Sequence, residues 1–304
     1  MVCDAKFTKQ TVETGKVFIV TGANAGIGKE TVLEIAKRGG TVIMACRNME
    51  KANQAREEIV SATNNPNILV RKLDLSSMDS IRQFAEGFKK ERDSLHVLIN
   101  NAGVMGLPRT LTKDGFEMQL GVNHMGHFLL THLLLDVLKK TAPSRIVNVS
   151  SALHERGTIN VDDLNSEKSY SRFGAYNQSK LANVLFTREL ARRLEGTGVT
   201  VNALHPGAVD TDLADSWPSA MKFVTKPAVW MFFKTPKSGA QTSLYAALDP
   251  ELENVTGKYF SDCKPKDVSS AAKDEKTAKF LWAESQKWTE YRYWYMVGTR
   301  PTGC

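Results

Sequence analysis

The chain has 304 residues, of which 42% are hydrophobic and 24% charged, a composition typical of soluble globular proteins. Its formal net charge is +7, but basic residues alternate with acidic ones, so the sequence lacks the basic stripe that nucleic-acid binding needs. The four cysteines lie far apart, which argues against a disulfide framework and a zinc site and fits a reducing compartment.

No apolar run reaches the length of a signal peptide or a membrane span, so we expect a cytoplasmic protein. One stretch, residues 217–233, is rich in Trp, Met, Phe and Val but is interrupted by two lysines. It could form a substrate lid, a patch in peripheral contact with a membrane, or a packed pair of helices.

Short, nearly continuous apolar runs predict β-strands that helices cover on both faces of a sheet. In chain order these runs are Lys16–Thr21, Thr41–Cys46, Asn67–Leu73, Val97–Asn100, Arg145–Ser150, Val199–Leu204 and Lys258–Phe260. The amphipathic stretches between them predict helices at Lys29–Arg38, Met49–Ser61, Met78–Glu91, Phe116–Lys140 and Ala175–Leu194. This alternation predicts an α/β, Rossmann-type doubly wound fold with a seven-stranded parallel sheet.

No linker, repeat or low-complexity tract divides the sequence, so we expect a single domain over residues 1–304. Within it, residues of about 16–150 are expected to form a cofactor half and residues of about 151–260 a catalytic and substrate half. An excursion is expected near residues 212–237, and residues 261–304 are expected to form a polar and aromatic C-terminal tail.

A glycine-rich turn, Thr-Gly-Ala-Asn-Ala-Gly-Ile-Gly, follows the first predicted strand and opens a helix. Glycines there let the backbone approach a pyrophosphate, and the helix N-terminus attracts the anion. The spacing is Gly-x-x-x-Gly-x-Gly and differs from the older Gly-x-Gly-x-x-Gly fingerprint, so an ordinary flexible turn is the alternative. We predict a nucleotide-binding turn that contains Gly22, Asn24, Gly26, Ile27 and Gly28.

The end of the second predicted strand bears on the choice of cofactor. NAD sites generally place a carboxylate about 20 residues beyond the turn, whereas an arginine accommodates the 2′-phosphate of NADP. Here no carboxylate lies between Glu34 and Glu50, and the strand ends at Arg47. Arg47 could simply cover the loop in solvent, but its planar, permanently charged guanidinium suits phosphate, so we predict NADP(H).

Tyr176 and Lys180 are four residues apart in a predicted helix, so they lie on one face, a turn apart. A nearby ammonium favours the phenolate and would lower the pKa of the tyrosine toward a useful range. Two residues at this spacing are common by chance, and a surface pair is the alternative. The strand over residues 145–150 ends in hydroxyls at the sheet edge where ligands bind, which strengthens the catalytic interpretation.

Six segments of this sequence resemble, in order and at suitable intervals, the motifs of the short-chain dehydrogenase/reductase family. They are TGANAGIGKE, NNAGVM, VNHMGHF, RIVNVSS, YNQSK and HPGAV. The resemblance covers residues of about 16–248 and implies hydride transfer between a nicotinamide cofactor and a hydroxyl or carbonyl group.

The resemblance also implies a role for individual residues. Tyr176 would be the general acid/base, Lys180 would lower its pKa and bind the nicotinamide ribose, Ser151 would bind the substrate oxygen, and Asn123 would hold a water of a proton relay. The remaining residues would lie along the cofactor: Asp74, Asn101 and Gly103 at the adenosine half and Pro206, Gly207 and Thr211 at the nicotinamide. The resemblance is further compatible with a homo-oligomer.

The separation of Ser151 and Tyr176 exceeds the family's usual dozen residues. The additional segment, residues 154–173, is similar to the retinol dehydrogenase-like branch, as is the later TPKSGAQTSLYAALDPELENVTGKYFSDC. This similarity implies a small lipophilic substrate interconverted between alcohol and aldehyde or ketone, with retinaldehyde as the main candidate. The alternatives are a steroid, farnesol or another carbonyl compound.

Two further hypotheses were weighed against this one. A non-catalytic dinucleotide sensor could keep the fold, but such a protein can dispense with the tyrosine or the lysine, and here both are present. Five histidines (His124, His127, His132, His154 and His205) could suggest metal ligation, but they lie on different predicted elements without a carboxylate at ligand spacing. We therefore expect structural histidines and no metal.

Overall fold

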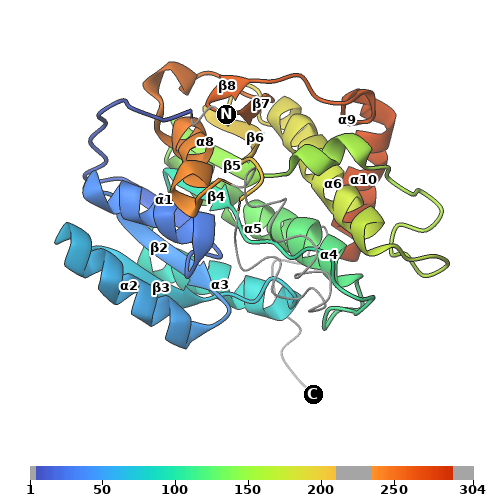
Figure 1. The fold of residues 1–304 in the computed structure, drawn as a ribbon, viewed down its shortest axis with the longest axis horizontal. Helices are drawn as coiled ribbons and strands as arrows, with labels where there is room; N and C mark the ends of the chain where they lie inside the picture. Colours follow the sequence, from blue (N-terminus) through green and yellow to red (C-terminus); the bar gives the residue numbers. More distant parts are fainter. Residues whose placement is uncertain (1–4, 210–233, 290–304) are drawn as a thin grey trace.

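A twisted sheet with helices on both faces forms the centre of the molecule in the computed structural model (Figure 1). The structure describes residues 5–209 and 234–289. The apolar stretch at residues 217–233, most of the expected excursion, Thr211 and the last fifteen residues lie outside this description. No helix within the described residues is long and apolar enough to cross a membrane.

The strand order is β3-β2-β1-β4-β5-β6-β7-β8, and all neighbouring strands are parallel except β7 and β8. The strands are β1 Val17–Thr21, β2 Thr41–Cys46, β3 Ile68–Lys72, β4 Val97–Asn100, β5 Ser144–Val149, β6 Val199–His205, β7 Tyr259–Ser261 and β8 Lys264–Pro265. The seven predicted parallel strands are thus confirmed, and the two-residue antiparallel β8 at the edge is an addition. The order reverses between β1 and β4, which opens a crevice for ligands at the carboxyl ends of the strands.

The longer helices are α1 Gly26–Lys37, α2 Met49–Thr63, α3 Met78–Glu91, α5 Gly126–Lys140, α6 Arg172–Arg193, α8 Pro236–Leu248 and α10 Glu275–Trp288. Short helical pieces occur at α4 Met118–Leu120, η1 Gly121–Met125, η2 Ala152–Arg156, η4 Pro250–Leu252 and α9 Ser270–Lys273. The single helix predicted for residues 116–140 therefore contains a wide π-helical turn, η1, because the chain accommodates one extra residue there.

Alternating side chains of the central strand β1 enter two separate cores. Ile19 of β1 packs with residues of α3, α5 and α6, whereas its neighbours Phe18 and Val20 pack with residues of α1, α2 and α8. All three strand residues are fully buried. Burial of each such side chain stabilises the fold by about 1.5–3 kcal/mol, so the two layers hold the sheet edge rigidly beneath the site.

Residues 261–304, expected to be a polar tail, contain a helix that belongs to the core. Helix α10 lies along the outside of α6 (Figure 1) and buries Ala278, Leu281 and Trp282 there. The Arg193 guanidinium lies 4.1 Å from the centre of the Trp282 ring. These apolar residues recur at helical spacing, so this helix could have been predicted from the sequence.

Candidate active site

The turn between β1 and α1 brings the predicted nucleotide-binding glycines together. Gly22 and Gly26 adopt positive φ angles of 65° and 54°, which side chains disfavour. A Cβ atom at Gly28 would lie 2.4 Å from the Gly22 carbonyl oxygen and 2.7 Å from Asn101 Nδ2. The turn is therefore closed tightly on itself and leaves its main chain open to a ligand.

Helix α1 has no side-chain cap at Ala25, the residue that precedes it. In contrast, α2, α3 and α6 each begin with a capping side chain, from Asn48, Ser77 and Ser171 respectively. The first amide groups of α1 are thus available to an anion, in the same turn that holds Asn24 and Ile27. Glycines at close approach and an uncapped N-terminus together fit the pyrophosphate of a dinucleotide.

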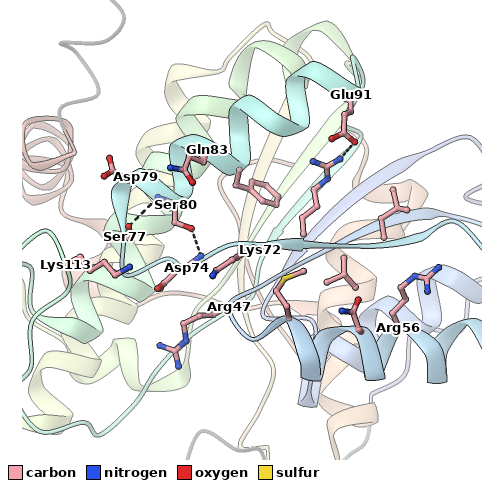
Figure 2. A pocket seen from close by; sticks show the side chains of 16 residues that line it. Arg47, Arg56, Lys72, Asp74, Ser77, Asp79, Ser80, Gln83, Glu91 and Lys113 are labelled. Atoms are coloured by element: carbon pink, nitrogen blue, oxygen red, sulfur yellow. Dashed lines mark hydrogen bonds and ion pairs between the residues drawn. The ribbon is translucent and has the colours of Figure 1, made fainter. Parts of the chain in front are cut away.

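A pocket of about 1020 Å³ lies at the outer edge of the sheet, beside β3 and between α2 and α3 (Figure 2). Arg47, which follows β2, and Asp74, which follows β3, both line it, together with Lys72 and Lys113. The Asp74 carboxylate accepts hydrogen bonds from the main-chain N–H and the hydroxyl of Ser76, at 3.0 and 2.6 Å. The predicted cofactor residues Arg47 and Asp74 are therefore brought to one pocket.

The loop after β4 connects the glycine turn to the interior. Asn101 Nδ2 donates to the Thr21 carbonyl oxygen over 2.8 Å. A Cβ atom at Gly103 would lie 3.3 Å from Asn123 Oδ1 and 3.4 Å from Lys180 Nζ. Asn101 and Gly103 thus bridge the predicted cofactor turn and the predicted catalytic residues.

Tyr176, Lys180 and Ser151 are brought together at the carboxyl end of β5. Tyr176 and Lys180 lie one turn apart on α6, with Lys180 Nζ 5.6 Å from the centre of the tyrosine ring. Ser151 follows β5, and its side chain hydrogen-bonds with the Tyr176 phenol. The Lys180 ammonium donates to the Val149 carbonyl oxygen over 3.1 Å.

Burial shifts both titratable groups toward their neutral forms. Desolvation raises the pKa of Tyr176 to about 12, against the opposing effect of the Ser151 hydrogen bond. Desolvation also lowers the pKa of Lys180 to about 8. Burial is the larger of the two effects on the phenol, and the lowering of its pKa by Lys180 stays a prediction. At neutral pH the phenol carries its proton.

Asn123 lies in the π-helical turn and is fully buried. Its Oδ1 accepts from the main-chain N–H of Val104 over 2.8 Å, and its Nδ2 donates to the Val104 carbonyl and to Ser179 Oγ, each over 2.9 Å. The side chain is therefore committed to the loop after β4 and to α6. The side chain thus has a hydrogen-bonding role within the core, and the role of Asn123 in holding a water stays a prediction.

Pro206 and Gly207 follow β6, at the same edge of the sheet as Ser151. The Gly207 N–H donates to His205 Nδ1 over 3.0 Å. The Lys234 N–H donates to the Ala208 carbonyl oxygen over 2.7 Å, so Lys234 lies beside the residues that follow β6.

Sequence reasoning missed two side chains that hold Ser151 in place. The Tyr259 hydroxyl donates to the Ser151 carbonyl oxygen over 3.3 Å, and His154 Nδ1 lies 2.8 Å from the same oxygen. Tyr259 belongs to a three-residue strand and reads in the sequence as an ordinary core aromatic. No local pattern links it to a serine 108 residues earlier.

The histidines of α5 and its neighbours have protein partners. His124 Nε2 lies 2.8 Å from Ser285 Oγ, His132 Nδ1 lies 2.7 Å from the Phe128 carbonyl oxygen, and His205 Nε2 lies 2.8 Å from Ser261 Oγ. Burial lowers the pKa of each of these rings. Within residues 5–209 and 234–289, no three potential ligating side chains form a metal-binding group.

A sequence model described as short chain dehydrogenase matches residues 16–222. This chain belongs to the short-chain dehydrogenase family. Human retinol dehydrogenase 12 is 57% identical to it over 268 residues, which are 88% of this chain and 84% of that protein. This short-chain dehydrogenase is thus an oxidoreductase of the retinol dehydrogenase-like branch.

Solved structures agree with the fold of this short-chain dehydrogenase. A protein from Mycobacterium paratuberculosis is 38% identical, with a TM-score of 0.76 over 94% of this chain and 98% of that chain. A short chain dehydrogenase from Shigella flexneri, complexed with NADP, is 25% identical, with a TM-score of 0.66 over 84% of this chain and 100% of that chain. The family uses NAD(P)(H) as its cofactor.

Proposed function

We propose that this short-chain dehydrogenase is an NADP(H)-dependent reductase of a lipophilic aldehyde, with retinaldehyde as its main substrate. The observation that carries the proposal is a buried Tyr176 hydrogen-bonded to Ser151 at the sheet edge. A phenol that holds its proton can donate it to a carbonyl oxygen, which is the proton transfer that reduction requires. The 57% identity to human retinol dehydrogenase 12 supports the substrate class.

NADP(H) is proposed as the cofactor because of the charges at the carboxyl ends of β2 and β3. Arg47 and Lys72 come from adjacent strands, and both line the pocket beside the predicted adenosine site, with Lys113 in the same lining (Figure 2). Asp74, in the same lining, accepts two hydrogen bonds from Ser76 through Oδ1. A 2′-phosphate would find a guanidinium in reach, and no carboxylate lies between Glu34 and Glu50, where an NAD site generally places one for the ribose.

Bound NADPH would supply a hydride to the carbonyl carbon of the substrate. The chain's own residues would then handle the oxygen: Ser151 donates a hydrogen bond to it, and Tyr176 donates the proton that completes the alcohol. Lys180 would bind the ribose and keep a positive charge near the phenol as it gives up its proton. Asn123 holds the loop after β4 against α6, which keeps these groups in register.

We also propose the division of labour expected from the sequence. Residues of about 16–150 would bind the cofactor, and residues of about 151–260 would carry the catalytic groups and choose the substrate. A steroid, farnesol or a general carbonyl compound is the second candidate substrate, since the apolar residues at 217–233 favour any greasy molecule over a sugar.

The test is a parallel assay of NADPH oxidation with all-trans-retinal, a steroid ketone and a short aldehyde. We expect retinal to give the highest kcat/KM. Equal activity on the short aldehyde would reject a lipophilic specificity, and inactivity on all three would favour a dinucleotide sensor.

The cofactor proposal is tested by Arg47→Ala. Loss of a charge-assisted contact should weaken NADPH binding about 10- to 100-fold and leave NADH binding nearly unchanged. Arg56→Ala is the matched control, because Arg56 lines the same pocket but donates to the Ile68 carbonyl oxygen. If the two variants bind NADPH equally well, Arg47 does not select the cofactor.

A further inference from the structure

One buried side chain, His127, connects the cofactor turn to the catalytic residues. It lies on α5, one turn beyond Asn123, and is 2% exposed. Its Nε2 lies 2.9 Å from Thr21 Oγ1, at the end of β1, and its Nδ1 lies 3.1 Å from the Asn123 carbonyl oxygen. The ring therefore touches the glycine turn on one side and the π-helical turn on the other.

The hydrogen bonds around Thr21 determine which ring nitrogen carries the proton. Thr21 Oγ1 accepts from the main-chain N–H groups of Asn101 and Ala102, each over 2.9 Å. A hydroxyl has two lone pairs and one proton, so its own proton must point to His127 Nε2. Nε2 is then an acceptor, and the proton of the neutral ring lies on Nδ1, which donates it to the Asn123 carbonyl.

Charge and burial agree with a neutral ring. Desolvation, with a smaller contribution from the charge of Lys180, lowers the pKa of His127 to about 4. A protonated ring would turn both nitrogens into donors, and Nε2 would then meet a Thr21 oxygen whose lone pairs are already used. Only the neutral ring with its proton on Nδ1 forms a hydrogen bond with both Thr21 Oγ1 and the Asn123 carbonyl oxygen.

The chain of hydrogen bonds continues from Asn123 to Tyr176. Asn123 Nδ2 donates to Ser179 Oγ over 2.9 Å, and Ser179 Oγ donates to the Tyr176 carbonyl oxygen over 2.7 Å. One connected series of contacts thus runs from the end of β1 through α5 to the helix turn that carries the phenol.

We propose that His127, as the neutral Nδ1–H tautomer, is a positioning residue that holds the cofactor turn in register with the helix of Tyr176. This inference rests on the proposed function, in which Tyr176 and the glycine turn act on one reaction. His127 is not assigned a contact with the cofactor or with the substrate. It acts through its hydrogen bonds to Thr21 and to the Asn123 carbonyl oxygen.

The first test needs no substitution and no substrate. In the protein labelled with ¹⁵N-histidine, the ring nitrogens of His127 are observed by NMR near neutral pH. A protonated Nδ1 with an unprotonated Nε2 is expected. The Nε2–H tautomer or a doubly protonated ring would overturn the proposal.

The second test compares His127→Asn with His132→Asn, a matched control on the same helix. His132 is also buried and also bonds a main-chain carbonyl four residues earlier, but its ring packs against Phe128 and Trp282, away from the site. Asparagine keeps a donor near the Nδ1 position and removes the acceptor for Thr21. Both variants should melt at lower temperature than the unmodified protein.

Only His127→Asn is expected to raise the NADPH dissociation constant and to lower kcat, each by about tenfold, the equivalent of roughly 1.4 kcal/mol. Equal NADPH affinity and kcat in the two variants would reduce His127 to a structural role and overturn the proposal.

Thr21 provides the third comparison, in case the histidine variants fold poorly. Thr21→Ser retains the hydroxyl and should bind NADPH as tightly as the unmodified protein does. The near-isosteric Thr21→Val lacks the hydroxyl and should bind NADPH as weakly as His127→Asn does. Equal NADPH affinity in both Thr21 variants contradicts the proposal. Because NMR and NADPH binding do not involve retinal, failure of the retinal assay alone would reject the substrate and leave this inference standing.

Discussion

At the scale of single residues, burial decides the protonation of the catalytic pair. The Tyr176 phenol, with a pKa of about 12, keeps its proton at neutral pH, while the Lys180 ammonium, with a pKa of about 8, is near its titration. Burial disfavours the charged form of each group. It therefore raises the pKa of the phenol, whose charged form is an anion, and lowers the pKa of the lysine, whose charged form is a cation. The pair is thus set for proton donation from the phenol.

Replacement of Tyr176 by phenylalanine should abolish turnover. A positioned general acid contributes about 10²–10⁴-fold to rate, and phenylalanine retains the ring but loses the proton. NADPH affinity should change little, because the phenol is assigned to the substrate oxygen. Steady-state kinetics and a fluorescence titration with NADPH measure the two effects, and undiminished turnover would remove Tyr176 from the mechanism.

Reductase activity should decline as pH rises through about 8. Lys180 has a lowered pKa, so its charge is present below that pH and lost above it, while Tyr176 stays protonated throughout this range. The kcat/KM for NADPH reports the ionisations of the free enzyme and is the quantity to follow. A profile that is flat from pH 6 to about 10 would show that the Lys180 charge is not needed for cofactor capture.

At the scale of elements, α10 supports α6 and so supports the site from behind. Trp282 is 7% exposed and packs on Phe128 and Phe186, with ring centres 5.3 and 6.0 Å away. Since α6 carries Tyr176 and Lys180, the late helix helps to fix the helix that presents the catalytic groups.

Truncation of Trp282 to alanine should lower the free energy of unfolding by about 3–5 kcal/mol, because a large buried ring leaves a cavity. Lys279→Ala, on the exposed side of the same helix, is the control and should change stability by less than about 0.5 kcal/mol. Denaturant unfolding measures both. If Trp282→Ala is as stable as the control, α10 does not contribute to the core.

At the scale of the whole molecule, cofactor binding should stabilise the fold, because the proposed site is formed by loops from several strands and exists only in the folded protein. Free NADPH at 100 times its dissociation constant adds about 2.7 kcal/mol to the stability of a protein that binds it only when folded. We expect the melting temperature to rise by a few degrees with NADPH and by less with the same concentration of NADH. Equal shifts would contradict a preference for NADP(H).

The sequence predicted most of the architecture because each of its signals is local. Continuous apolar runs marked the seven parallel strands, and Met78–Glu91 was placed with the bounds that the structure has. The glycine turn and the pair Tyr176 and Lys180 are also short-range patterns, in which spacing along the chain determines spacing in space. The resemblance in six ordered motifs then pointed to the family, and the segments at residues 154–173 and 235–263 pointed to its branch.

Contacts between distant segments were beyond the reach of that reasoning. Three contacts join residues about 90 or more positions apart in the sequence. They are the hydrogen bond from Tyr259 to Ser151, the packing of α10 on α6 and the hydrogen bond between Thr21 and His127. The pKa shift of Tyr176 depends on the same three-dimensional enclosure. The sequence by itself determined which elements form and which chemical groups they carry; the tertiary structure decided which groups meet and how far they are removed from water, because desolvation and hydrogen bonding depend on neighbours in space.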